Sequence, residues 1–259
     1  MNFLSAIVLG AVEGLTEFLP VSSTAHLLIS ERLLGLAASD FAKTFAISIQ
    51  LGAILAVVVL YWRRLTTDKE LWGKLLAAFL PTAVLGLLFY KIIKTYLLED
   101  LPLIAWALLI GGVLIIIFEL VINHRSFSDQ TVDFSTITYK KAMLIGLAQC
   151  LAFVPGVSRA AATILGGLSL KINRQTIVAF SFLLAMPTML AATGLDLVKN
   201  AGGFSNGQIE LWLAGFITAF IVAAAVIKGF VTFVGKHNFV IFGIYRLIIG
   251  ALILWLARP

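Results

Sequence analysis

The sequence predicts an all-α polytopic membrane protein with an inverted-topology repeat, made of six transmembrane helices plus two re-entrant helix-loop-helix pairs. Three observations support this prediction. Hydrophobic residues make up 61% of the 259-residue chain and charged residues only 12%, whereas soluble domains contain about 45–50% and about 25%. Six apolar runs are long enough to cross a bilayer. Two further apolar segments are each interrupted by a proline within a polar stretch.

The first interrupted segment covers residues 3–35 and is broken at 19–23. Each side of the break has only about 10–17 residues, which is too short to span a bilayer. Pro20 ends the first helix, and the serines after it are residues that commonly cap a new one. We therefore expect a re-entrant pair, because irregular backbone at membrane depth is tolerated only where it faces protein or a wet cavity.

The second interrupted segment covers residues 139–170 and is broken at 154–159 around Pro155. Three apolar runs of spanning length follow each broken segment: 41–62, 72–93 and 101–122 after the first, and 175–198, 208–234 and 239–257 after the second. Glu119 lies near the end of one of these spans, and we expect its side chain to reach water.

The two halves of the chain resemble each other. The stretch from Gly10 to Ser23 aligns with the stretch from Gly146 to Ser158 with one deletion. Because the repeated unit crosses the membrane an odd number of times, its second copy must be inserted upside down. We expect one membrane domain over residues 1–259, with repeat 1 at about 1–125 and repeat 2 at about 139–259.

The net charge of +6 is attributed to basic loops rather than to nucleic-acid binding, so no nucleic-acid partner is expected. Most of the 19 Lys and Arg residues fall in loops on one predicted side, such as 63–74 and 228–236. The positive-inside rule makes that side cytoplasmic. Both termini are then outside, and the single Cys150 excludes an internal disulfide.

Two carboxylates lie four residues apart in the first interrupted segment, at Glu13 and Glu17. This spacing places them on one helix face. An ionisable group within the membrane is a functional-site hypothesis by default, because its burial costs several kcal/mol. A bridging divalent cation, Mg²⁺ or Ca²⁺, would let both stay ionised. The alternatives are a pair that faces an aqueous pore and a proton relay.

A hydroxyl cluster and an imidazole follow the same break. Ser22, Ser23 and Thr24 are candidate helix caps, and at least one of them is expected to do only that. The functional interpretation makes Ser23 a nucleophile and His26 its general base or acid. Attack by His26 itself or by a metal-bound water stays open.

The second break contributes Ser158 and Arg159. A guanidinium matches phosphate as a bidentate donor, and a helix N-terminus adds free N–H groups and a positive dipole end. The pair is therefore a candidate phosphate site. The alternative is an ion pair between Arg159 and Glu13 or Glu17. Arg246, also at membrane depth, is expected to pair internally.

At these residues the chain resembles the undecaprenyl-diphosphate phosphatases of the bacitracin-resistance type. The first shared motif is Glu13-Gly-Leu-Thr-Glu17-Phe-Leu-Pro20-Val-Ser-Ser23-Thr-Ala-His26, and the second is Pro155-Gly156-Val157-Ser158-Arg159. Further likenesses are Phe180-Ser-Phe-Leu-Leu-Ala-Met-Pro187 and Tyr245-Arg246. Three residues depart from the family pattern: Ala25 replaces a glycine, and Ala160 and Ala161 replace a Ser-Gly pair.

The resemblance implies an enzyme that removes the terminal phosphate of a C55 polyprenyl diphosphate with a divalent cation. This recycles the lipid carrier for cell-wall synthesis and gives bacitracin resistance. It also implies the bacterial inner membrane, with an active site that opens to the periplasmic or outer face. A homodimer is compatible with it. The implied site residues are Glu13, Glu17, Ser23, His26 and Arg159 for catalysis, Glu13 and Glu17 for the metal, and Arg159, Ser158, Thr163 and Ser22 for phosphate.

Two other classes of protein fit parts of this pattern. A secondary transporter or lipid-carrier flippase on the same inverted repeat would explain the breaks, but it does not need a phosphate-binding arginine. A type 2 phosphatidic-acid-like phosphatase also uses Ser and His. It would carry K-x6-R-P and P-S-G-H segments, and this sequence contains neither.

Overall fold

The structure is a computed structural model that describes residues 1–37, 39–92, 100–122, 131–199 and 206–256. All regular secondary structure in these ranges is helical. Four helices are long and apolar enough to cross a membrane, at 69–90, 101–121, 174–195 and 208–234. The prediction of an all-helical membrane protein is therefore confirmed. The other two predicted spans are present as shorter apolar helices, at 44–60 and 240–256.

The helices follow the predicted order with small differences at their ends, except that the stretch 63–74, which the sequence assigned to a loop, contains a short helix and the start of the next one. The first half contains α1 (Phe3–Thr16), α2 (Ser23–Leu33), α3 (Asp40–Leu60), α4 (Trp62–Thr67), α5 (Lys69–Ile92) and α6 (Leu101–Ile117), which continues as a π-helical turn, Phe118–Ile122. The second half contains α7 (Tyr139–Gln149), α8 (Arg159–Ser169), α9 (Arg174–Lys199), α10 (Asn206–Val234) and α11 (Val240–Leu256). The predicted ends at 93, 125 and 257 lie outside the described residues.

Both interrupted segments contain a helix, a break and a second helix, as the sequence predicts. α1 ends before Glu17 and α2 begins at Ser23, while α7 and a short 3₁₀ turn, Cys150–Phe153, precede the second break. Ser22 and Ser158 have φ values of 72° and 73°, a left-handed conformation that is uncommon for residues other than glycine. The backbone therefore matches Ser158 with Ser22, one residue before the serine that the sequence alignment pairs with it.

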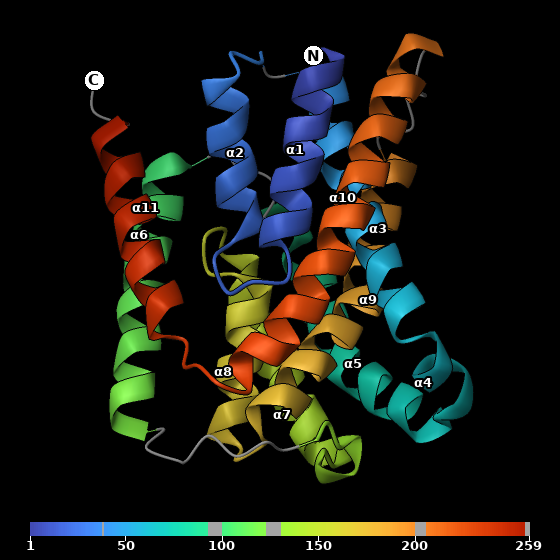
Figure 1. The fold of residues 1–259 in the computed structure, drawn as a ribbon, viewed down its shortest axis with the longest axis vertical. Coiled ribbons are helices and arrows are strands. Elements are labelled where there is room, and N and C mark those ends of the chain that lie inside the picture. The colour runs from blue at the N-terminus through green and yellow to red at the C-terminus, as the bar shows by residue number, and fades with distance from the viewer. Residues whose placement is uncertain (38, 93–99, 123–130, 200–205, 257–259) are drawn as a thin grey trace.

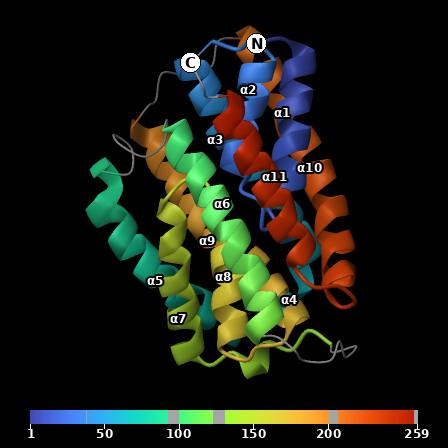
Figure 2. The same ribbon diagram turned by 90° about the vertical axis from the view of Figure 1, so that its left-hand side faces the viewer.

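The first helix of each half packs against the other half of the chain. α1 packs along α10 of the second half, and α7 packs along α5 of the first half. Figures 1 and 2 show the two breaks near mid-height and both termini at the same end of the bundle. α6 and α11 pack side by side on one side of the molecule (Figure 2). The breaks therefore meet at the centre of the fold, where the candidate site residues lie.

Glycines allow α1 and α7 to approach the other half of the chain closely. A Cβ at Gly10 would collide with the carbonyl of Gly215, and one at Gly146 would collide with the carbonyl of Ala78. Each glycine thus lets α1 or α7 contact the backbone of the helix on which it packs. This close approach fixes the depth at which the following break lies.

We expect Gly146→Ala to lower the unfolding temperature in detergent, because the α5 backbone must move away from the new methyl group. Overpacking of this kind costs about 1–3 kcal/mol. Gly194→Ala is the matched control, since nothing lies within 4 Å of a Cβ there and alanine favours helix. Equal unfolding temperatures for the two variants would contradict the close packing of α5 and α7.

Candidate active site

An ion pair joins the two breaks. Nη2 of Arg159, the first residue of α8, lies 2.9 Å from Oε1 of Glu17, which follows α1. The two side chains are only 11% and 7% exposed. The sequence offered Arg159 either a phosphate or a carboxylate as its partner. The structure shows the carboxylate of Glu17. Both halves of the chain contribute to the same buried cluster.

Ser23 completes the first part of this cluster. Its hydroxyl donates to Oε2 of Glu17 over 2.5 Å, so the two carboxylate oxygens of Glu17 face different partners. The nearest proton acceptor for Ser23 is therefore Glu17, whereas the sequence paired Ser23 with His26. A carboxylate that accepts the hydroxyl hydrogen of a serine can act as its general base.

Ser181 binds the other terminal nitrogen of Arg159, and Thr163 contacts Ser181. Nη1 of Arg159 donates to the carbonyl oxygen of Ser181 over 2.8 Å and lies 3.3 Å from the hydroxyl. That hydroxyl is 2.6 Å from Oγ1 of Thr163, which also donates to the carbonyl of Arg159. Nε of Arg159 is buried and has no partner within the described ranges. The guanidinium thus keeps one donor free beside the break.

The roles of the two serines at the breaks differ. Ser158 caps α8 by accepting from the N–H of Ala161 over 3.2 Å. Ser22 makes no side-chain cap, although both serines have the same unusual backbone conformation. The hydroxyl of Ser22 therefore does not cap α2. The carbonyl oxygen of Ser22 contacts His26, as described below.

Glu13 is fully buried, and both of its carboxylate oxygens lack a hydrogen-bond partner among the described residues. It lies one helical turn from Glu17, whose N–H donates to its carbonyl. An unpaired buried carboxylate is costly, and a divalent cation would satisfy it. No group of three or more His, Cys, Asp or Glu in the described ranges could hold a metal. Two carboxylates with waters and phosphate oxygens are nevertheless a usual Mg²⁺ set, so the residues fit such an ion.

Both ring nitrogens of His26 contact groups other than the hydroxyl of Ser23. Its Nδ1 lies 2.8 Å from the carbonyl oxygen of Ser22, and its Nε2 lies 2.6 Å from the hydroxyl of Tyr245 on α11. The two rings are nearly parallel, with an interplanar angle of 6°. Tyr245 was noted in the sequence only as part of the Tyr245-Arg246 likeness. Like Ser181, it lies in a largely apolar helix and had no spacing signal of its own.

Arg246 ties the breaks to α6. It is fully buried and donates to five carbonyl oxygens, those of Pro20 (3.2 Å), Val157 (2.9 Å), Gly156 (2.8 Å), Ala107 (3.0 Å) and Leu108 (3.4 Å). Its guanidinium lies against Gly111, where a Cβ would collide with it. The expected internal pairing thus takes the form of a backbone clamp on both breaks. Arg246 positions the site but does not line it.

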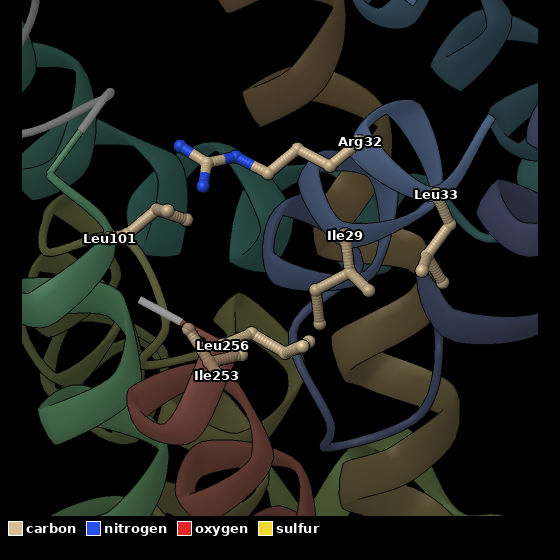
Figure 3. Close-up of a pocket in the computed structure, with 6 residues that line it drawn as sticks. All are labelled: Ile29, Arg32, Leu33, Leu101, Ile253 and Leu256. Atoms are coloured by element: carbon tan, nitrogen blue, oxygen red, sulfur yellow. The ribbon is translucent and has the colours of Figure 1, made fainter. Parts of the chain in front are cut away.

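An apolar groove lies between α2, the start of α6 and the end of α11 (Figure 3). Its lining residues are Ile29, Arg32, Leu33, Leu101, Ile253 and Leu256. Arg32 extends its guanidinium across the groove from the last turn of α2. Ile29 lies three residues after His26, so the groove begins one helical turn beyond that imidazole.

Comparison with known proteins gives a consistent result. A family model described as bacitracin resistance protein BacA matches residues 6–252. A protein of Persephonella marina named undecaprenyl-diphosphatase is 49% identical over 257 residues, covering 98% of both chains. Proteins of the same name from Wolinella succinogenes and Aquifex aeolicus are 47% and 45% identical, covering 98% and 96% of both chains. The chain therefore belongs to the bacitracin resistance protein BacA family.

Proposed function

We propose that this protein hydrolyses undecaprenyl diphosphate to the monophosphate and inorganic phosphate. The observation that carries the proposal is the buried cluster of Glu17, Ser23 and Arg159, which combines a hydroxyl, its proton acceptor and a phosphate-binding cation. Membership of the BacA family, whose relatives are named undecaprenyl-diphosphatase, supports the substrate. The reaction returns the lipid carrier for cell-wall synthesis and would give resistance to bacitracin.

In this mechanism Oγ of Ser23 attacks the terminal phosphorus, and its proton passes to Oε2 of Glu17. A bond forms between Oγ and phosphorus, the bond to the bridging oxygen breaks, and the lipid monophosphate leaves. Protonation removes the charge of Glu17, which weakens its ion pair with Arg159. The guanidinium can then turn to the phosphate oxygens, where charge develops. A water then attacks the phosphorus, the bond between phosphorus and Oγ breaks, and Oγ takes back its proton from Glu17 as inorganic phosphate leaves.

Further groups around the phosphate complete this proposal. Ser22, Ser158 and Thr163 lie at or next to the break residues and would add hydroxyl contacts to the phosphate. The N-terminus of α8 adds a positive dipole end. His26 would act as general acid or base through its Nε2. These assignments rest on position in the fold.

Glu13 and Glu17 would hold a divalent cation, which neutralises phosphate charge when it is bound. The unpaired oxygens of Glu13 support this assignment. Before the proton of Ser23 is transferred, a cation at this position also lets the two carboxylates stay ionised side by side.

We infer six transmembrane helices and two re-entrant pairs related by an inverted repeat. The reciprocal packing of α1 on α10 and α7 on α5 supports this arrangement, as do the matching φ values of Ser22 and Ser158. α4, the start of α7 and the end of α10 lie together at one end of the bundle, opposite both termini (Figure 1). These segments carry basic residues, so that end would face the cytoplasm of the inner membrane. The site would then open to the outer face.

The polyprenyl tail would lie in the bilayer along the groove between α2 and α11, which is apolar except for Arg32. No nucleic-acid partner is proposed. A homodimer is compatible with this function but is not needed for catalysis, because residues of one chain supply both halves of the cluster.

The experiment that tests the function is phosphate release from undecaprenyl diphosphate by the purified full-length protein in detergent, with and without a chelator. We expect release that falls with the chelator and returns with added Mg²⁺, since the cation neutralises phosphate charge. Glu13→Gln should keep the fold but lose the response to Mg²⁺.

Two results would contradict this account in different ways. No release from any lipid diphosphate, together with movement of the lipid across vesicles that contain the protein, would favour a flippase. Full release in the presence of the chelator would remove the cation from the reaction and leave the phosphatase function standing.

A further inference from the structure

The contacts of His26 fix which of its nitrogens carries hydrogen. Nδ1 lies 2.8 Å from the carbonyl oxygen of Ser22, and a carbonyl oxygen only accepts, so Nδ1 is the protonated nitrogen. In the neutral ring Nε2 is then an acceptor. The hydroxyl of Tyr245, at 2.6 Å, is its donor. Only Nε2 can gain or lose a proton without breaking the contact with Ser22.

A hydroxyl is suited to both protonation states of Nε2. It can donate to the neutral nitrogen, and it can accept from the protonated one. A carbonyl partner would fit only the protonated ring, and an ammonium partner would fit only the neutral ring. The imidazole of His26 can therefore change its protonation state while it keeps the same two neighbours and the same position.

The position of Tyr245 is fixed by the residue that follows it. Arg246 is clamped by the carbonyls of both breaks, including that of Pro20. The same helix, α11, thus holds the first break through Arg246 and the imidazole beyond that break through Tyr245. Tyr245 is 39% exposed, so its hydroxyl can also reach a group outside the protein.

We propose that Tyr245 is a positioning residue for His26. The hydrogen bond between the hydroxyl of Tyr245 and Nε2 of His26 reverses its direction during the reaction. When water attacks the phosphate on Ser23, a proton of that water passes to the phenolic oxygen as the phenolic proton passes to Nε2; an N–H bond forms, and Nε2 then donates to the phenolic oxygen. The phenolic hydrogen then turns to a phosphate oxygen of the substrate. When Nε2 returns the proton by the same route to the departing inorganic phosphate, the first arrangement returns. This inference rests on the proposed phosphatase function and names a further residue of its site.

Steady-state kinetics with undecaprenyl diphosphate is the first test. We expect Tyr245→Phe, which keeps the ring, to lower kcat about tenfold, the size of one hydrogen bond, with KM within about twofold. Tyr61→Phe is the matched control, because it removes a phenolic hydroxyl after α3 at the α4 end of the bundle. A purely packing role would leave Tyr245→Phe as active as the wild type, and that result would overturn the proposal.

A double-mutant cycle tests whether Tyr245 acts through His26. His26→Gln alone should lower kcat more than Tyr245→Phe, and the double variant should be no slower than His26→Gln, because the two residues act as a unit. Independent, multiplying losses would overturn the proposal.

A spectroscopic readout is independent of turnover. In a His124→Gln, His237→Gln background, His26 is the remaining histidine, and its ¹⁵N resonances report which ring nitrogen carries hydrogen. We expect an unprotonated Nε2 whose resonance shifts in Tyr245→Phe and stays unchanged in Tyr61→Phe. A protonated Nε2 with an unprotonated Nδ1, or no shift in Tyr245→Phe, would overturn the proposal. If the wild type releases no phosphate, the proposed function fails and this spectrum still decides the role of Tyr245.

Discussion

Glu17→Gln should lower phosphate release by about 100- to 10,000-fold, the contribution of a general base. The amide is close to isosteric with the carboxylate, but it cannot accept the proton of Ser23 or balance the charge of Arg159. Both contacts run through Glu17 in the structure, at 2.5 Å and 2.9 Å. Phosphate release from undecaprenyl diphosphate by purified variants measures the effect.

The control for this substitution is Glu31→Gln, the same chemical change on α2 outside the cluster. It should release phosphate at the wild-type rate. Similar rates for Glu17→Gln and the wild type would remove Glu17 from the mechanism and leave Ser23 without its proton acceptor.

Loss of stability must be separated from loss of chemistry in Glu17→Gln. Removing one partner of a buried ion pair costs about 3–5 kcal/mol, because the other charge stays buried. The double variant Glu17→Gln, Arg159→Gln removes both charges, so it should regain much of the unfolding temperature and remain inactive. Recovery of activity in the double variant would show that the loss in the single variant came from misfolding.

Arg246→Met should cause a loss of stability comparable with that of Glu17→Gln. Methionine fills much of the same volume, but it leaves the carbonyls of Pro20, Gly156 and Val157 without their donor. An unsatisfied buried carbonyl costs about 1 kcal/mol or more, so we expect a loss of roughly 3 kcal/mol. Thermal unfolding in detergent measures it, and activity should fall as well because the breaks lose their relative position.

The matched control is Arg32→Met, which removes an exposed guanidinium from the groove at the end of α2. Its unfolding temperature should stay close to that of the wild type. If Arg246→Met were as stable as this control, the carbonyls would have other partners and the clamp would not hold the breaks.

The sequence predicted the breaks because Pro20 and Pro155, each followed by serines, are strong local signals within apolar segments. It also predicted that the carboxylates and Arg159 would meet, since an inverted repeat brings both breaks to the same depth. It could not predict which groups pair. The left-handed conformation of Ser22 directs its carbonyl toward His26. The hydroxyl of Ser23 then donates to Glu17 instead of to His26.

One expectation about a charged side chain was wrong. Glu119 does not reach water but lies 5% exposed in the π-helical turn after α6. It binds Arg174 through two contacts of 2.6 Å and accepts from the N–H of Phe239 over 3.3 Å. Arg174 is 55 residues from Glu119 along the chain and lies in a stretch that the sequence assigned to a loop. A pairing between the ends of distant helices has no local signal.

The clamp formed by Arg246 has a consequence for biosynthesis. Its carbonyl partners lie in both breaks and in α6, but Arg246 itself is in α11, which follows all of them along the chain. Proteins begin to fold from the N-terminus during synthesis, so a nascent chain holds Glu13, Glu17 and Arg159 well before it holds the residue that fixes their positions. The enzyme would therefore gain its activity only after α11 has been synthesised and has inserted beside α6.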